Sequence, residues 1–451
     1  MHSESLMLSE LLADQELTLL LARWQMAFTL GSHIILACFG VGMPWLILAA
    51  EAIWLRTDDS LWYQLARRWS KAFAVMFAVG AVSGTVLSFE LGLLWPRFME
   101  TFGSVIGLPF TMEGFAFFLE AIFAGIYLYG WGRLEGWWHW LTGVPIAISG
   151  VMSAWFVVTA NAWMNTPQGF DWDGQSATDP RPIEAMLNAA TGAQTTHMIL
   201  AAFMVTGFVV AAYYAWRLLK QPSCTYSQRA LALGLTMGVL ITPFQMWVGD
   251  WSAKVVAESQ PVKLAAMESH FETARGAHLL IGGVPDIENS EVRYGIKVPG
   301  MLSFLAFGDF EAEVLGLEEF PREHWPPVPI VHVAFQVMVG IGTWLMLLSA
   351  ISIGIAIKRP RLEKVRWWLW LVIVSGPLVV IAMEAGWVVT EVGRQPWIAQ
   401  GYMYTRDAVQ EQGGLLPLFI STLVIYGVLA FGTIFTLRRL ASIPLEQTDA
   451  S

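Results

Sequence analysis

The sequence predicts an all-α membrane protein, and its composition is the first reason. Of its 451 residues, 55 % are hydrophobic and only 14 % are charged, and the mean hydropathy is +0.53. A soluble globular domain differs clearly, since roughly a quarter of its residues are charged. The 23 tryptophans also fit, because indole rings gather at the two interfaces of a bilayer.

Nine apolar segments of helical length predict nine transmembrane helices. Each is long enough for one span, since a hydrocarbon core of about 30 Å needs about 20 helical residues. We find no low-complexity tract and no internal repeat between them. The predicted helices cover approximately residues 26–50, 72–94, 111–130, 137–160, 191–216, 230–248, 328–357, 367–390 and 415–437.

Lysine and arginine predict the orientation of these helices. They concentrate in the loops that follow odd-numbered helices, such as Arg67, Arg68 and Lys71 after the first. By the positive-inside rule these loops are cytoplasmic, so we expect the N-terminus outside and the C-terminus in the cytoplasm. The long acidic connection, residues 249–326, then lies outside. We therefore expect a single membrane domain over residues 1–451 with one sizeable extracytoplasmic loop.

The first predicted helix holds no Asp, Glu, Lys or Arg, and His33 is its only basic group. A lone histidine in a helix is often a hydrogen-bonded structural residue, but inside a bilayer the polar ring needs a partner. Gly31, Gly40 and Gly42 thin the helix around it. This pattern suits the close approach of a flat macrocycle or, alternatively, plain packing between helices.

The third predicted helix carries two acids, Glu113 and Glu120, seven residues apart and therefore nearly on one face. Acids inside a membrane are costly, and proton relays use them. The alternative is an interfacial Glu113 and a structural, hydrogen-bonded Glu120. The fourth helix ends in SAWFVVTANAWMNTP, where Ser153 and Asn161 are the polar members.

The fifth and seventh helices contribute His197 and Met338. Imidazole with thioether is an axial ligand pair of six-coordinate haem iron, whereas a single methionine in a span usually fills space. With a rise of about 1.5 Å per residue, we expect His33, His197, Met338 and Glu391 all in the outer half of the membrane.

The eighth helix closes with GWVVTEVGRQPW at residues 386–397. Glu391 lies at the membrane boundary, Arg394 follows on the same helical face, and Pro396 is expected to end the helix. One interpretation is an ion pair of Glu391 and Arg394 at a helix end, flanked by interfacial tryptophans such as Trp387. The other is that Glu391 binds a metal centre or carries protons, because an acid at this depth is costly without a partner.

Charge and cysteine content exclude several function classes. The net charge of −10 gives no reason to expect nucleic acid as a partner. Cys38 and Cys224 form no disulfide framework and no CxxCH motif for covalent haem attachment.

Six stretches, in the same order along the chain, resemble subunit I of the cytochrome bd-type quinol oxidases. The resemblance covers about residues 20–440 and implies a nine-helix bundle. The stretches are MEGFAFFLEAIF at 112–123, SAWFVVTANAWM at 153–164, TTHM around His197, QPVKLAAMESHFET at 260–273, FQVMVG around Met338 and GWVVTEVGRQPW at 386–397.

The resemblance implies a set of haem ligands. His197 and Met338 match the axial ligands of a low-spin haem b beside the quinol site. His33 and Glu391 match ligands of the two high-spin haems, and which of them serves which haem stays open. One high-spin haem is of b type, and the other is haem d or a third haem b.

The resemblance also implies supporting residues. Trp387 belongs to the catalytic centre beside the high-spin pair, and Arg394 binds the cofactor. Lys263 and Glu268 match quinol-site residues in a loop of the short type. The path that brings protons to the catalytic centre matches acidic and polar residues of the third and fourth helices, namely Glu113, Glu120, Ser153 and Asn161.

Two departures from the family pattern concern the haems. Gln336 stands where the family often has an arginine beside the ligating methionine, and the loss of that charge is expected to alter the potential of the low-spin haem. Residues 88–98, SFELGLLWPRF, look closer to the cyanide-insensitive branch, in which haem b replaces haem d.

We therefore expect a quinol:oxygen oxidoreductase that oxidises quinol at the outer face and reduces O2 to water, generating a proton motive force without pumping. The alternatives are a haem-bearing quinol reductase that does not act on O2 and a secondary transporter. Expected partners are subunit II of the same oxidase, a single-helix accessory subunit and the lipid bilayer. The expected location is the bacterial cytoplasmic membrane, with a thylakoid membrane as the alternative.

Overall fold

The computed structural model describes residues 2–358, 364–410 and 413–443. Within these ranges nine helices are long and apolar enough to cross a membrane, which confirms the predicted fold class. These long helices are α1 (His2–Thr57), α2 (Ser60–Leu94), α3 (Pro96–Gly130), α4 (Gly136–Asn165), α6 (Thr191–Lys220), α7 (Thr225–Ser259), α10 (Val328–Lys358), α11 (Arg366–Val392) and α13 (Leu415–Ser442).

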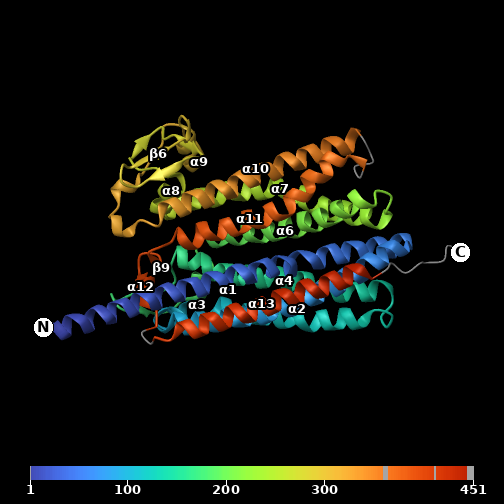
Figure 1. The fold of residues 1–451 in the computed structure, drawn as a ribbon, viewed down its shortest axis with the longest axis horizontal. Coiled ribbons are helices and arrows are strands. Elements are labelled where there is room, and N and C mark those ends of the chain that lie inside the picture. Colours follow the sequence, from blue (N-terminus) through green and yellow to red (C-terminus); the bar gives the residue numbers. More distant parts are fainter. Residues whose placement is uncertain (1, 359–363, 411–412, 444–451) are drawn as a thin grey trace.

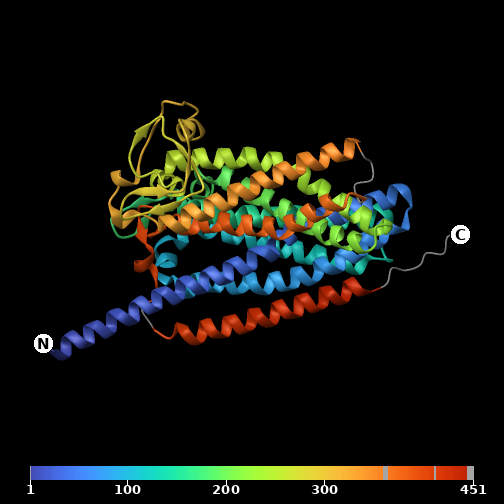
Figure 2. The same cartoon turned by 45° about the horizontal axis from the view of Figure 1, so that its top comes forward.

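The long helices of the described chain form two groups of four (Figure 1), and α13 lies on the outer side of the first group (Figure 2). In the first group, α1 and α3 each pack on both α2 and α4. In the second group, α6 and α10 each pack on both α7 and α11. Contacts of α6 with α1 and α4 join the two groups, and α13 packs on α2 and α1.

Short elements fill the connections at the end of the molecule that carries the start of α1, as Figure 2 shows. The helical ones are α5 (Pro182–Met186), α8 (Pro261–Glu268), α9 (Met301–Phe307), η1 (Leu317–Glu319), η2 (Arg322–His324) and α12 (Thr405–Ala408). The strands are β1 (Asp171–Trp172), β2 (Ala177–Thr178), β3 (Ala274–Arg275), β4 (Leu279–Ile281), β5 (Val284–Asp286), β6 (Glu291–Arg293), β7 (Ile296–Val298), β8 (Glu313–Val314), β9 (Trp397–Ala399) and β10 (Met403–Tyr404). They pair antiparallel as β1–β2, β3–β8, β4–β7, β5–β6 and β9–β10.

Four predicted helix bounds are wrong by more than ten residues. The second helix begins at Ser60, not near residue 72, and the third begins at Pro96, not near residue 111. The first helix begins at His2, about seven turns before residue 26, so the depth of His33 counted from residue 26 has the wrong reference point. The sixth helix continues to Ser259, so the loop expected from residue 249 begins at Gln260. Hydropathy detects only the apolar part of a helix, whereas the backbone ladder continues into polar turns. There Lys254 and Asp250, one turn apart, form an ion pair of 2.6 Å.

Close helix packing in the second group depends on glycine. A Cβ atom at Gly207 of α6 would lie 2.6 Å from the backbone nitrogen of Gly238 on α7. The two backbones are therefore in direct contact, as small residues permit in membrane helices.

A separate hydrophobic cluster lies beneath the long loop and fixes α8 against the second group. Its members come from α8, α9, α10 and α11, and they include Leu264, Ala265, Met267, Leu302, Val331 and Val389. This packing decides where the side chains of α8 point.

Candidate functional site

His197 lies on α6 beside α7. Its two ring nitrogens are 3.4 and 3.2 Å from the same atom, Gln245 Nε2. A Cβ atom at Gly249 would lie 3.4 Å from the ring carbon Cε1, so glycine leaves the ring free of crowding. Because one amide nitrogen cannot satisfy two ring nitrogens, the imidazole keeps bonding capacity for another partner.

Met338 lies on α10 against α11. A Cβ atom at Gly386 would lie 3.1 Å from Met338 Sδ. The neighbouring residue, Trp387, donates a hydrogen bond of 3.2 Å to the sulfur of Met198 on α6. Adjacent residues of α11 therefore contact Met338 on one side and the neighbour of His197 on the other. The predicted ligands His197 and Met338 lie at the same depth in one four-helix group.

His33 lies on α1 in the other group and faces α2. Its Nδ1 is 2.9 Å from Ser83 Oγ, so Nε2 is the ring nitrogen left for iron. A Cβ atom at Gly84 would lie 2.9 Å from the ring, closer than such contacts occur, so this position needs glycine. Gly42 faces α6 instead, because a Cβ atom added there would lie 2.2 Å from Thr206 Oγ1. For Gly42 the structure supports plain helix packing.

Glu391 is held at both oxygens. Arg394 Nη2 donates to Oε2 at 2.6 Å, and Asn161 Nδ2 donates to Oε1. The predicted ion pair of Glu391 and Arg394 is thus present, although α11 ends at Val392, before Pro396. Each carboxylate oxygen has two lone pairs, so these contacts orient the group and leave an acceptor position at each oxygen.

Arg394 is a buried guanidinium with unused donors. Its side chain is 3 % exposed, and among the described residues its Nε and Nη1 have no hydrogen-bond partner. Unpaired charged donors are costly in a buried position. These atoms are therefore available for an acidic group between the helices.

Lys263 joins the Glu391 cluster through two asparagines. Its Nζ donates to Asn165 Oδ1, and to the carbonyl of Thr390 at 3.4 Å. Asn165 Nδ2 donates in turn to the backbone oxygen of Asn161 at 3.0 Å. Burial, with a contribution from the positive charge of Arg394, holds the pKa of Lys263 well below its usual value.

Glu268, the other expected quinol-site residue, points elsewhere. It lies five residues after Lys263 on α8, which is about 140° around a helix with 3.6 residues per turn. The carboxyl is 4 % exposed, and its Oε2 has no partner among the described residues. Burial raises the pKa of Glu268 to about 8. The structure thus brings Lys263 to Glu391 and leaves Glu268 in a separate buried position.

The expected proton-path acids face α4. Ser153 Oγ donates to Glu113 Oε1 at 3.1 Å. A Cβ atom at Gly150 would lie 3.4 Å from Glu120 Oε1, so glycine makes room for this buried carboxyl. Glu113, Glu120 and Ser153 share the interface of α3 and α4, whereas Asn161 belongs to the Glu391 cluster.

Comparison with known proteins decides the family. Residues 21–443 match the model of the family described as cytochrome bd terminal oxidase subunit I. The chain belongs to this family. The match confirms the predicted resemblance and the predicted class of enzyme, and it decides against a secondary transporter.

Individual relatives cover nearly the whole chain. A putative cytochrome bd menaquinol oxidase subunit I of Bacillus subtilis is 37 % identical, covering 93 % of this chain and 95 % of that protein. A cytochrome bd ubiquinol oxidase subunit 1 of the same organism is 30 % identical, covering 92 % and 90 %. The solved structure of bd oxidase from Geobacillus thermodenitrificans aligns with a TM-score of 0.89 at 40 % identity, covering 94 % of this chain and 98 % of that chain.

Haem, the cofactor that membership of a cytochrome family implies, fits the residues described. His197 and Met338 offer an imidazole and a thioether at one depth, each against a glycine. His33 offers a ring nitrogen, and the free donors of Arg394 suit the carboxylate of a haem propionate.

Gln336 has a role that the sequence did not reveal. Its side chain accepts from the backbone nitrogen of Gly282 at 2.9 Å and donates to the carbonyl of Leu280 at 3.0 Å. It therefore ties the long loop to α10.

Sequence reasoning also missed a buried cluster at the far end of α3. Tyr127 donates to Glu51 Oε2 at 2.5 Å, and His139 Nδ1 lies 2.6 Å from Glu51 Oε1. His139 Nε2 lies 3.0 Å from the carbonyl of Tyr127 and must donate to it, so Glu51 and Nδ1 share one proton. The missed signal is spacing, because Tyr127 continues the seven-residue interval of Glu113 and Glu120.

A second missed acid is Glu384, seven residues before Glu391 on α11. Its Oε1 is buried and has no partner among the described residues. A Cβ atom at Gly31 of α1 would lie 3.2 Å from its Oε2, so glycine leaves room for the carboxyl between α1 and α11. The same seven-residue spacing would have revealed it.

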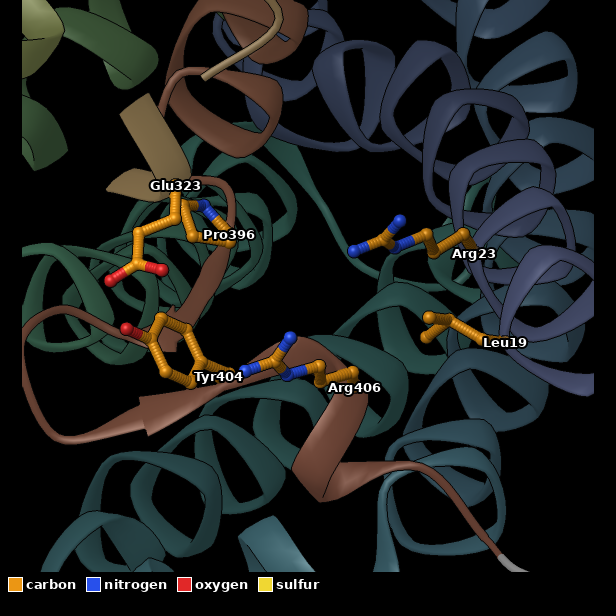
Figure 3. A pocket seen from close by; sticks show the side chains of 6 residues that line it. All are labelled: Leu19, Arg23, Glu323, Pro396, Tyr404 and Arg406. Atoms are coloured by element: carbon orange, nitrogen blue, oxygen red, sulfur yellow. The ribbon is translucent and has the colours of Figure 1, made fainter. Parts of the chain in front are cut away.

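A pocket at the loop end of the molecule lies apart from these residues (Figure 3). Arg23 of α1 and Arg406 of α12 point into it, and the Arg406 guanidinium lies 4.9 Å from the centre of the Tyr404 ring. Leu19, Glu323 and Pro396 complete the lining. The lining includes none of the predicted iron ligands or quinol residues.

Proposed function

We propose that the chain is the haem-bearing subunit of a quinol:oxygen oxidoreductase. The observation that carries this proposal is the paired position of His197 and Met338, two complementary iron donors at one depth in one helix group. The names of its relatives, which are menaquinol and ubiquinol oxidases, support quinol as the reductant.

His197 and Met338 would hold a low-spin haem b, and His33 and Glu391 would supply ligands for a high-spin pair of one haem b with haem d or a third haem b. Haem bound by these residues would supply electron transfer from quinol and a site for O2 reduction. Asn161 and Arg394 orient Glu391, and the free donors of Arg394 would bind propionate.

Lys263 and Glu268 serve the quinol in different ways. Glu268 offers a free, buried carboxyl oxygen beneath the loop and would accept a proton from the quinol. Lys263 is held by Asn165 toward the Glu391 cluster. It would therefore influence the charge around Glu391, a proposed haem ligand, on the side of α8 opposite Glu268.

Protons for water would pass along the face of α3. The acids Glu113 and Glu120 follow one another at intervals of about 10 Å, and Ser153 and Asn161 add polar groups toward Glu391. Tyr127 with Glu51 and His139 extends this line toward the end of α1 that the distribution of Lys and Arg marks as cytoplasmic. Proton release outside and uptake from the cytoplasm would generate a proton motive force without pumping.

The family implies a second subunit, and we propose a single-helix accessory subunit as a further partner in a bacterial cytoplasmic membrane. Large apolar side chains are exposed along α3 and α13, for example Phe115, Phe118, Val424 and Phe431. Lipid or these subunits would cover them.

A difference spectrum of the purified membrane complex tests the proposal. We expect b-type bands in the reduced-minus-oxidised spectrum, part of them responding to carbon monoxide, together with O2 consumption on addition of quinol. A far-red chlorin band would identify haem d as the third haem. Haem that never responds to carbon monoxide would favour a reductase that does not act on O2, and the absence of haem would overturn the proposal.

A further inference from the structure

Buried polar groups without partners lie at both ends of α8: Gln260 precedes its first residue, whereas Glu268 and His332 lie where its last turn meets α10. Gln260, Glu268 and His332 are 2 %, 4 % and 0 % exposed. Among the described residues, both side-chain atoms of Gln260, Oε2 of Glu268 and Nε2 of His332 have no hydrogen-bond partner. Folded proteins rarely leave such atoms unpaired, so the free atoms of Glu268 and His332 suggest a polar ligand between α8 and α10.

The tautomer of His332 follows from its one contact. Nδ1 lies 2.8 Å from the backbone oxygen of Met267. A carbonyl oxygen can only accept, so Nδ1 carries the hydrogen. In the neutral ring Nε2 is then an unprotonated nitrogen with a free lone pair, and this atom is the one that lies buried and unpaired.

His332 and Glu268 belong to the same place. The carbonyl that His332 contacts is that of Met267, the residue directly before Glu268, and α8 packs against α10 here. Burial raises the pKa of Glu268 to about 8, so at neutral pH most of these carboxyls already hold a proton. A quinol that must lose two protons therefore needs another acceptor.

The other basic groups of α8 and its neighbourhood are engaged. The Lys263 nitrogen donates to Asn165 and Thr390, on the side away from Glu268. His270 Nε2 lies 3.1 Å from the carbonyl of Val314. In the described part of this region, His332 Nε2 is the basic nitrogen left open.

We propose that His332 is a catalytic residue that accepts one proton of the quinol through Nε2. This rests on the proposed quinol oxidase function. The quinol loses two O–H protons and two electrons and becomes the quinone. The electrons would pass to the haem proposed at His197 and Met338. One proton goes to His332 Nε2, and the other goes to Glu268 after that carboxyl has released its own proton to the outer water.

Two variants of His332 in the intact complex test the proposal. His332→Asn keeps a donor for the Met267 carbonyl and removes Nε2. His332→Gln places an amide near Nε2 that can form a hydrogen bond but cannot take up a proton. Because general acid–base groups contribute roughly 10²–10⁴-fold, and because Glu268 remains, we expect kcat for quinol oxidation to fall at least about tenfold in both. The low-spin haem spectrum should stay unchanged.

The matched control is His278→Gln, the same exchange at an exposed position of the long loop, which should leave kcat unchanged. A kcat within twofold of wild type in His332→Asn would overturn the proposal, as would loss of haem from both variants, which would make His332 structural. Failure of the wild-type complex itself to oxidise quinol would instead refute the proposed function.

Discussion

Replacing Gly386 by alanine should disturb the low-spin haem through Met338. The new Cβ atom would lie 3.1 Å from Met338 Sδ, whereas ordinary contacts begin near 3.4 Å, so the sulfur must move by a few tenths of an ångström. Alanine is favoured over glycine by about 1 kcal/mol inside a helix, while overpacking costs about 1–3 kcal/mol. We therefore expect small net destabilisation and a strained thioether ligand.

The assay is a potentiometric titration of the low-spin haem, with its absorption spectrum. Because a methionine ligand raises the reduction potential, a displaced Met338 should lower it and turn part of the haem high-spin. Gly340→Ala is the matched control, because it lies two residues from Met338 on α10 and a Cβ there meets no atom within 4 Å. An unchanged potential and spectrum in Gly386→Ala would refute the assignment of Met338 as a ligand.

Three further predictions follow from buried polar groups. The pKa of Glu268 rises from 4.5 to about 8 in the folded chain, so between these pH values the unfolded chain loses this proton more readily and the free energy of unfolding falls as the pH rises. Glu268→Gln should therefore match wild type near pH 5 and be more stable by up to about 4 kcal/mol at pH 8. The measurement is the difference in melting temperature, which should grow with pH. A difference that does not change with pH would contradict the burial of this carboxyl. Glu120→Gln should slow O2 consumption at least about tenfold with full haem content, because the amide cannot relay a proton; undiminished turnover would remove Glu120 from the path. Asn165→Ala leaves Lys263 without its main acceptor and should cost about 1–3 kcal/mol in stability, and an unchanged melting temperature would show that Lys263 finds another partner.

Residue types and helix periodicity made much of this arrangement predictable. Apolar segments of about 20 residues predict spans because a bilayer leaves the backbone few other choices. His33 and His197 stood out because basic side chains are rare in apolar helices, and Met338 did so through its expected depth near that of His197. The contact of Glu391 with Arg394 followed from three-residue spacing and formed even though α11 ends between them.

Contacts between residues far apart in the sequence could not be predicted from the sequence. Nothing local in KLAAME says that Lys263 turns toward α4 while Glu268 turns away, because the hydrophobic cluster beneath the loop sets the rotation of α8. The partners of Tyr127 come from α1 and α4, at distances in sequence that no motif covers. The sequence indicated only that Gln336 lacks a charge, whereas the folded structure reveals that its amide forms hydrogen bonds with the backbone of the long loop.

Charge balance explains why the Glu391 cluster can stay buried. Glu391 and Arg394 neutralise one another, so a protonated Lys263 would leave one uncompensated positive charge. Both contacts of the Lys263 nitrogen are donations, which a neutral amine can make as well as an ammonium. Burial and the charge of Arg394 favour that neutral form. An acidic group bound at the free donors of Arg394 would add a negative charge to this cluster and favour the protonated form of Lys263. Binding next to Arg394 would therefore add a positive charge to α8, the helix that also carries Glu268.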